Sequence, residues 1–336
     1  MEKLSSNNKI DLVVLWVDGN DKEWLSEKNK YLHIIGDAGD NRFRDCENLQ
    51  YLFRGIDKYA PWVNKVFFIT WGHVPSWLDT TNKKLRIVKH EELIPKENLP
   101  TFNSNVIELN LHRIEDLSER FVLFNDDFFI LKETKANDFF EGYIPKDVYV
   151  EYTQLASYYN DLHFFMKANI LAIINKHFNK HDFYKKYFFK AVNPKYGHFF
   201  NSKTLYSMKF KKKFCGFWNF HAPLPYLKDT FKRVWEIEKE NLEMACENKF
   251  RASTDLGHYL CRYWQFCEGN FLPKKDESKY FIYQNNNDQT VKAIEGQKYK
   301  FICINDAYMD IDFEKGKKEI NAAFAKIFPN KSQFEK

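Results

Sequence analysis

Two adjacent aspartates, Asp126 and Asp127, follow the apolar run Phe121–Phe124 and are the first candidates for chemistry in this chain. Neighbouring carboxylates supply the hard oxygen ligands that Mg²⁺ prefers, and Mg²⁺ commonly takes one or two of them together with substrate phosphates. A solvated loop is the alternative, and a pair of acids alone is a weak motif. Its position after a buried run favours a site for Mg²⁺ or Mn²⁺ against a diphosphate, with Asn125 beside it.

Two further aspartates stand in loops where a structural role competes with a chemical one. Asp18 follows the apolar run Ile10–Val17, and an Asp-Gly pair there could simply form a turn. Asp45 precedes a helical pattern, so it could cap a helix N-terminus or face a phosphate or a sugar. Taken singly, the structural readings of Asp18 and Asp45 are favoured.

Two basic residues of the second half complete the set of candidates. His221 could act as a general base or acid, because imidazole titrates near neutral pH. Arg251 could clamp a phosphate, because a planar guanidinium binds two oxygens at once. A lone histidine is more often structural, and Arg251 could equally lie on the surface before a helix, so neither residue is decisive by itself.

The elements that must position these residues alternate between strand and helix in the first half. Apolar runs typical of buried parallel strands occur at 10–17, 66–70, 85–88 and 121–124. Apolar residues at helical spacing occur at 49–56, where Pro61 stops the pattern, and at 106–114. This order predicts an α/β, Rossmann-like core with a mainly parallel sheet. Ligands bind beyond the carboxyl ends of such strands, where Asp18 and Asp126 would both lie.

The second half is predicted to be more helical. Helices are expected at 166–178, 228–248 and 253–267, the last with Ser253 as a cap, and short strands at 280–283 and 300–304. No stretch has the Pro, Gly and Ser content of a linker. We therefore predict one compact unit over 1–336, with a nucleotide-sugar-binding core at 10–140, a variable helical insertion at 141–215 and a second part of the site at 216–310.

Composition excludes several classes of protein. Aromatic residues make up 18% of the chain, which argues against disorder, and the formal charge of +5 is too small to indicate nucleic acid binding. The six cysteines form no CxxC pair, so a zinc site is not indicated. The residues before Lys9 form no apolar leader, and no stretch reaches the ~20 apolar residues that span a bilayer. These features predict a cytoplasmic protein with reduced thiols.

The chain resembles the Stealth family, because separate blocks match the signatures of that family in the same order. The matching blocks are Ile10–Asp21, Arg42–Arg54, Tyr59–Val63, Val74–Leu78, His90–Glu92, Leu99–Ser104, His112–Ile114, Leu117–Phe121, Phe124–Asp127, His221–Pro223, Phe250–Ser253 and Phe301–Asp306. The similarity is dense from 10 to 140 and sparser from 215 to 310. Where the family usually reads Asp-Asn-Asp/Glu-Glu-Leu, this chain has Cys46 and Asn48, and no role is carried onto them.

The resemblance implies a function and a set of site residues. Stealth proteins move a sugar 1-phosphate from a UDP-sugar to a hydroxyl of an acceptor glycan and release UMP, here in bacterial capsule or cell-surface polysaccharide synthesis. The implied catalytic residues are His221, Arg251 and Asp45, of which His221 and Asp45 could exchange roles. The implied substrate contacts are Asp18, Asn103, Arg113 and Asn125, and the implied metal ligands are Asp126 and Asp127, with Mg²⁺ or Mn²⁺ as cofactor.

Two other functions remain open at this point. An ordinary glycosyltransferase would use the same donor and acidic loop but would release UDP. A non-catalytic carbohydrate-binding protein would use exposed aromatics and would leave His221, Arg251 and the aspartate pair unexplained. The basic excess and the aromatic residues would also allow a peripheral contact with the inner face of the cell membrane, and capsule assembly machinery is a further possible partner.

Overall fold

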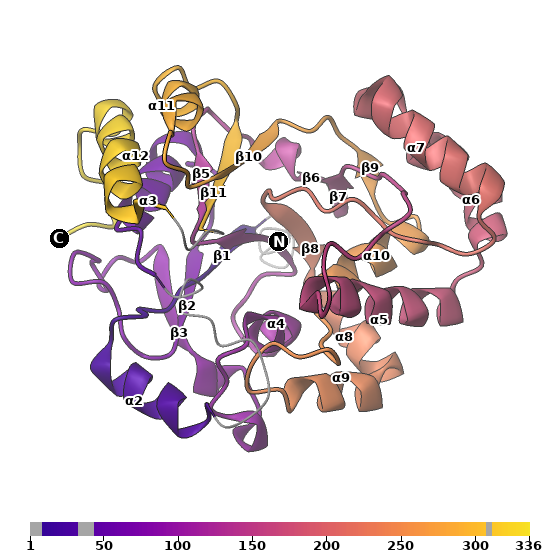
Figure 1. The fold of residues 1–336 in the computed structure, drawn as a ribbon, viewed down its shortest axis with the longest axis horizontal. Helices are drawn as coiled ribbons and strands as arrows, with labels where there is room; N and C mark the ends of the chain where they lie inside the picture. Colours follow the sequence, from indigo (N-terminus) through magenta and orange to yellow (C-terminus); the bar gives the residue numbers. More distant parts are fainter. Residues whose placement is uncertain (1–8, 33–43, 307–310) are drawn as a thin grey trace, which may run out of the picture.

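A five-stranded sheet forms the centre of the protein, for which a computed structural model describes residues 9–32, 44–306 and 311–336 (Figure 1). The strand order is β3-β2-β1-β4-β8; β1, β2, β3 and β4 run parallel, and β8 is antiparallel to β4. The bounds are β1 Ile10–Leu15, β2 Val66–Thr70, β3 Leu85–Lys89, β4 Arg120–Asn125 and β8 Leu224–Leu227. The prediction of a mainly parallel α/β sheet is confirmed, and the second half of the chain supplies its last strand.

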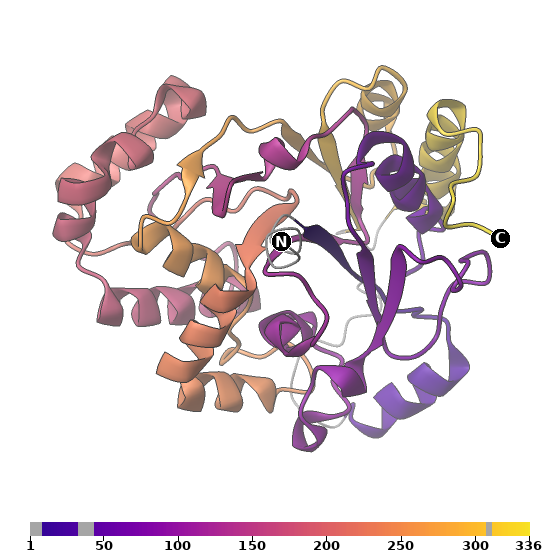
Figure 2. The same cartoon turned by 180° about the vertical axis from the view of Figure 1, so that it is seen from behind.

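Alternate residues of the strands face two separate hydrophobic cores, as a sheet covered on both faces requires. Leu12 and Val14 of β1 pack in one core, whereas Val13 packs in the other. The first core lies under α3 (Leu49–Tyr59) and α12 (Phe313–Ile327). The second core lies under α4 (Ser104–Leu109), α5 (Leu162–His177) and α10 (Tyr259–Cys267), so helices far apart in the sequence cover the same face of the sheet (Figure 2).

A second sheet is bound to the first through α3. It contains β5 (Phe128–Ile130), β11 (Phe301–Asn305) and β10 (Ser278–Ile282), with β11 antiparallel to β5 and parallel to β10. Gly55 of α3 lies so close to β5 that an added Cβ would be 2.8 Å from the Ile130 carbonyl oxygen. A glycine is therefore needed there to bring the helix against the strand. The predicted strands at 280–283 and 300–304 correspond to β10 and β11.

The remaining elements are mostly helices, and α6 and α7 lie at the opposite end of the molecule from α12 (Figure 1). The helices are α2 Lys22–Lys30, α4 Ser104–Leu109, α5 Leu162–His177, α6 Lys180–Ala191, α7 Gly197–Phe210, α8 Lys228–Ile237, α9 Lys239–Cys246, α10 Tyr259–Cys267 and α11 Asp288–Glu295. The short strands are β6 Phe140–Glu141, β7 Ile144–Asp147 and β9 Leu272–Pro273. Short 3₁₀ turns occupy His90–Glu92, Lys96–Asn98, Leu111–Arg113, Ala136–Asp138 and Pro194–Tyr196.

The predicted helix at 228–248 is wrong as one element, because the chain breaks at Glu238 between α8 and α9. The backbone of Glu238 is not helical there, and its side chain is buried. Its carboxylate accepts a hydrogen bond from Lys176 Nζ at 2.7 Å and contacts the ring of His177. These contacts with Lys176 and His177 at the end of α5 hold the Glu238 carboxylate in the interior, and the helix is interrupted at this residue.

Two other predicted helices have wrong boundaries. The helix predicted at 253–267 begins only at Tyr259, because Asp255 is buried and accepts hydrogen bonds from side chains outside the helix. Ser253 is therefore not its cap. The helix predicted at 106–114 ends as an α-helix at Leu109 and continues as a 3₁₀ turn at Leu111–Arg113.

The outer edge of the first sheet is closed by a side chain. The carboxamide of Gln265 on α10 accepts from the Leu227 backbone N–H at 3.1 Å and donates to the Pro225 carbonyl at 3.3 Å. Gln265 thus pairs with two backbone groups of β8 as a neighbouring strand would. In the three described parts of the chain, no helix is both long enough and apolar enough to cross a membrane.

Candidate active site

The two acidic loops predicted from the sequence emerge at the same edge of the sheet. Strands β1 and β4 pair in register, with Leu15 opposite Asn125, so the loop at Asp18 and the turn at Asp126 follow adjacent strand ends. The Asp18 backbone N–H donates to His73 Nε2 at 2.8 Å, and its carboxylate accepts from the Asn20 N–H at 2.8 Å. The contact with His73, which follows β2 (Val66–Thr70), fixes the loop after β1 to the loop after β2.

Asp127 is held from the neighbouring strand β11. Its Oδ2 atom accepts from Asn305 Nδ2 and from Cys303 Sγ, both at 3.2 Å, and its backbone carbonyl accepts from the Ile304 N–H at 3.0 Å. Its Oδ1 atom is buried without a hydrogen-bond partner, the only carboxylate oxygen in this condition among the described residues. A buried, unpaired carboxylate oxygen is costly, so this atom is poised for a ligand.

Four carboxylates converge around this turn, which we call the acidic side: Asp18, Asp45, Asp126 and Asp127. Surrounding protein and then the charges of Asp127 and Asp45 raise the pKa of Asp126 to about 7, although part of its side chain reaches solvent. Burial and the charge of Asp18 raise the pKa of Asp45. Burial also raises the pKa of Asp127, against hydrogen bonds that act in the opposite direction. The cluster is electrostatically unfavourable until a cation or a proton enters it.

These residues fit the cation that the sequence predicts. Among the described residues, no group of three or more His, Cys, Asp and Glu side chains could hold a metal ion by itself. Mg²⁺ does not need such a cage, because it is usually bound by one or two carboxylates together with waters and substrate phosphates. Asp126 and the unpaired oxygen of Asp127 match that donor set.

A group of basic residues, the basic side, faces the aspartates: His163, Lys167, His221 and Arg251. The ring of His221 packs at a tilt against that of Tyr280, with ring centroids 4.3 Å apart, and His221 is exposed to solvent. The surrounding protein lowers its pKa, the charge of Asp127 raises it, and the charge of Lys167 lowers it. The imidazole of His221 is therefore mainly neutral at pH 7. It lies close enough to Asp127 of the acidic side and to Lys167 of the basic side for both charges to act on it.

The sequence analysis missed His163 and Lys167, which lie one turn apart on α5. Burial and the charges of Lys167, Arg251 and His221 lower the pKa of His163 to about 3. Burial lowers the pKa of Lys167, partly offset by Asp161. Both residues stand in the region 141–215, where the resemblance gave no alignment. Their spacing of four along a helix was the available signal, but only the packing of α5 brings them to the site.

Arg251 joins the basic side from the loop before α10. Its Nη2 atom donates to Ser104 Oγ at 3.1 Å, and its charge acts on both His163 and Glu108. Burial raises the pKa of Glu108 to about 7, and the charge of Arg251 lowers it. His221 and Arg251, thirty positions apart in the sequence, are thus brought to one group with α5.

Other predicted site residues occupy different surroundings. Asn103 is buried and caps α4; its Nδ2 atom donates to the Phe250 carbonyl and to Asp255, which favours a structural role.

Arg113 stacks on Trp235 with its guanidinium carbon 4.8 Å from the ring centroid and lies on the α8 side. Asn125 ends β4 beside the acidic side. Arg42, the first residue of a matching block, lies outside the described residues, and Arg44 forms a bidentate ion pair with Asp306 at 2.5 and 2.6 Å.

Comparison with known proteins agrees with the resemblance. Models of two regions match this chain: Stealth protein CR1, conserved region 1, at residues 8–36, and Stealth protein CR2, conserved region 2, at residues 42–147. Capsular polysaccharide phosphotransferase WcwK of Streptococcus pneumoniae is 41% identical over 99% of this chain and 100% of that protein. Receptor polysaccharide phosphotransferase WefC of Streptococcus gordonii is 37% identical over 97% of this chain and 99% of that protein. The solved galactosyltransferase LgtC, in complex with donor and acceptor sugar analogues, is 8% identical over 93% of this chain and 95% of that chain, with a TM-score of 0.41.

The full-length relatives define the class of this protein, which is an enzyme that transfers phosphate-containing groups. The chain belongs to the Stealth family, since it matches relatives named for this chemistry along nearly its whole length. The predicted family and enzyme class are confirmed.

Proposed function

We propose that this enzyme transfers a hexose or N-acetylhexosamine 1-phosphate from a UDP-sugar to a hydroxyl of an acceptor glycan, in the synthesis of capsule or another cell-surface polysaccharide. The observation that carries the proposal is the opposition of an acidic side and a basic side beyond the carboxyl ends of β1 and β4. A diphosphate donor requires both: carboxylates that bind it through a cation, and cations that neutralise the phosphoryl group in transfer. The names of the relatives support a phosphate-containing group and a polysaccharide product.

The mechanism follows from the charges of this chain. The acceptor hydroxyl attacks the sugar-bearing phosphorus of the donor, a new O–P bond forms, and the P–O bond to UMP breaks with its electron pair leaving on UMP. His221, mainly neutral at pH 7, takes the hydroxyl proton. Lys167 and Arg251 bind the non-bridging oxygens of the transferred group, and charge on the phosphate offsets the burial of Lys167.

The acidic side has a different task in this proposal. Asp126 and Asp127 would hold Mg²⁺, or Mn²⁺, which when bound neutralises the diphosphate. Asp18 holds the loop after β1 against His73 and is proposed as a contact of the donor. Asp45 is proposed either as a contact of the acceptor hydroxyl or as the base in place of His221, because its raised pKa brings it closer to neutral pH.

The nucleotide product tests the proposal directly. The purified protein is incubated with a panel of UDP-sugars, magnesium and an acceptor oligosaccharide, and the released nucleotide is identified by chromatography. UMP together with a phosphodiester-linked product is the expected result. Release of UDP with a glycosidic product would instead establish an ordinary glycosyltransferase. Acceptor binding with no turnover of any donor in the panel would contradict the proposal and favour a binding protein.

A further inference from the structure

One stretch of the chain has an extreme charge pattern. No aspartate or glutamate occurs between residues 183 and 228, although acidic residues are 46 of the 336 in the chain. We call residues 183–213 the lysine-rich arm, because nine lysines stand in it: Lys185, Lys186, Lys190, Lys195, Lys203, Lys209, Lys211, Lys212 and Lys213. The formal net charge of +5 is thus smaller than the charge of this arm alone, and the rest of the chain is net acidic.

The arm is also the place where large aromatic side chains are exposed. Phe189 on α6 is 81% exposed, and Phe199, Tyr206 and Phe210 on α7 are 64%, 56% and 59% exposed. The last three stand at intervals of seven and four residues, so they share one face of α7. Lys203 Nζ lies 4.7 Å from the ring centroid of Phe199, and Lys209 Nζ lies 5.2 Å from that of Phe210. Lysines therefore flank the exposed rings.

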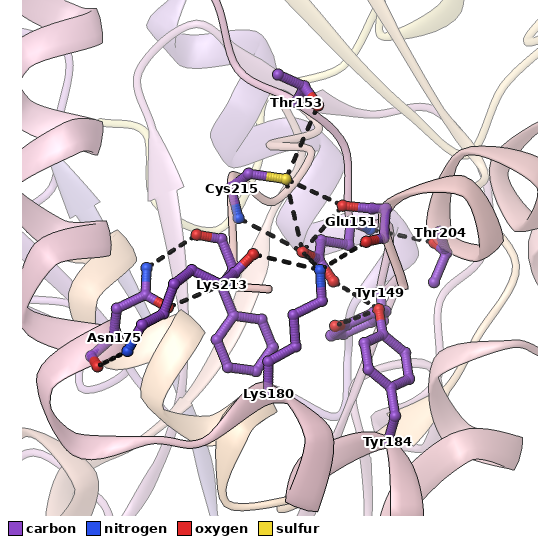
Figure 3. Close-up of polar contacts among 11 residues, drawn as sticks. Tyr149, Glu151, Thr153, Asn175, Lys180, Tyr184, Thr204, Lys213 and Cys215 are labelled. Carbon is purple, nitrogen blue, oxygen red and sulfur yellow. Dashed lines mark hydrogen bonds and ion pairs between the residues drawn. The ribbon is translucent and has the colours of Figure 1, made fainter. Parts of the chain in front are cut away.

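Polar contacts hold the inner side of this helix. Thr204 and Ser207 are its only buried residues, with Phe200 and Met208 partly buried against the core. Thr204 Oγ1 accepts from the Glu151 N–H at 3.1 Å, and Ser207 Oγ donates to the Glu151 carboxylate at 3.0 Å (Figure 3). An ordinary surface helix turns its apolar face to the core. Here the outward face carries the exposed rings.

The same network fixes the arm to the body of the protein. Lys180 Nζ donates to the Glu151 carboxylate at 2.7 Å and to the Ser207 carbonyl at 2.8 Å, and the Tyr184 hydroxyl donates to Glu151 at 2.6 Å (Figure 3). Both charged groups of this ion pair are buried. The contacts join α6, α7 and the segment after β7, and both helices lie at the periphery of the molecule (Figures 1 and 2). The exposed rings of α7 are therefore held in a defined orientation.

We propose that the outer face of the lysine-rich arm binds the surface of an anionic lipid bilayer. Exposed phenylalanines flanked by lysines, without a neighbouring carboxylate in the sequence, match the interfacial region of such a membrane, where rings enter the acyl boundary and ammonium groups stay at the headgroups. Each lysine near the surface adds attraction that falls with salt. The bilayer accounts for both the apolar and the cationic parts of this surface.

Vesicle sedimentation tests the proposal without any measurement of enzyme activity. The full chain is mixed with vesicles of phosphatidylcholine alone or with added phosphatidylglycerol. We expect binding to the anionic vesicles, little binding to the neutral ones, and release at high salt. The variant Phe199→Ser/Tyr206→Ser/Phe210→Ser should bind at least about tenfold more weakly. The variant Lys185→Gln/Lys209→Gln/Lys212→Gln should lose a similar factor and most of the salt dependence.

Matched variants elsewhere provide the controls. Ile237→Ser/Met244→Ser removes exposed apolar side chains from the region of α8 and α9, and Lys83→Gln/Lys96→Gln/Lys292→Gln removes exposed lysines outside the arm. Both should bind anionic vesicles as the unaltered chain does. Equal binding to neutral vesicles, equal losses in the controls, or no vesicle binding by the unaltered chain would overturn the proposal. Displacement from vesicles by acceptor oligosaccharide, with arm variants that lose the oligosaccharide as well, would identify the surface as a glycan site instead.

Discussion

Three of the four aspartates of the acidic side follow neighbouring strands, and Asp45 precedes α3, whereas the basic side comes from α5 and from two loops of the second half. Asp18 and Asp126 are placed by the register of β1 and β4, which is a local consequence of two apolar runs. Lys167 and Arg251 meet only because α5 packs against α10 and the segment before it, where Asn169 of α5 donates to the carbonyls of Ser253 and Asp255. The difference fits the proposed function, in which the sheet edge would bind the donor through a cation and the later elements would act on the phosphoryl group that is transferred.

The largest effect is expected at the acidic side. Asp127→Asn should reduce turnover by about a thousandfold, because it removes charge and one of two carboxylates from the proposed metal site. It should also weaken Mn²⁺ binding, measured by electron paramagnetic resonance of the free ion, and exhaustive chelation of the unaltered enzyme should abolish turnover. His221→Ala is the matched control, since it should leave Mn²⁺ binding intact. Full turnover after chelation would remove the metal from the mechanism.

A smaller but still large effect is expected for His221→Ala. Turnover should fall about a hundredfold or more, because proton transfer from the acceptor hydroxyl loses its base. The unaltered enzyme should lose activity as pH falls through a pKa below the ordinary 6.5, since protonation of His221 removes the base. That limb of the pH–rate profile should disappear in the variant. If the limb persists in His221→Ala and disappears in Asp45→Asn, the two residues exchange their proposed roles.

Lys167 and Arg251 should give the next effects, between about tenfold and a hundredfold, because each supplies a charge-assisted contact to the phosphoryl group. Lys167→Gln should lose turnover, and Lys167→Arg should recover part of it. Arg251→Lys should stay impaired, because an ammonium cannot make a bidentate contact. The melting temperature of the same variants distinguishes the loss of a phosphoryl contact from misfolding. Early melting with normal turnover per folded molecule would exclude both residues from the site.

The smallest expected effect is a change in stability with pH, and its direction follows from the raised pKa of Asp126. The pKa of Asp126 is about 7 in the folded protein and lower in the unfolded chain, so the folded state binds this proton more tightly. Stability is therefore lost as pH rises from about 4 to about 7. Asp126→Asn should raise the melting temperature of the metal-free protein at pH 8, by a few degrees at most, because solvent screens an exposed group. The gain should shrink toward pH 4 in circular dichroism melts; an equal gain at both pH values would contradict it.

The order of elements in the first half could be predicted from sequence, and parts of the second half could not. Short buried runs such as Val66–Thr70, rich in β-branched and aromatic residues, favour strands over helices, so their pattern predicted the sheet. The break at Glu238 depends on Lys176 and His177, which are about sixty positions away and carry no local signal. The late start of α10 likewise depends on carboxamides that contact Asp255 from elsewhere in the chain.

The candidate site shows the same limit. Asp126 stands after a strand end, and the position of ligand sites in parallel sheets is enough to select it. From the sequence alone, His163 and Lys167 cannot be distinguished from ordinary exposed residues of a helix. The family resemblance gave no alignment over 141–215. Asn103 shows the converse: it lies in a matching block, yet its carboxamide is occupied by Phe250 and Asp255. A sequence match alone does not distinguish a residue that supports the site from one that contacts a ligand.

The carboxamide of Gln265 against β8 has a consequence for assembly. An exposed strand edge invites pairing with another molecule, which leads to aggregation or to strand exchange. Pro225 has no N–H to offer, and Gln265 already occupies the Pro225 carbonyl and the Leu227 N–H, so an incoming chain finds this edge closed. Two residues therefore keep the central sheet from growing beyond its fifth strand, the one strand of this sheet that the second half of the chain supplies.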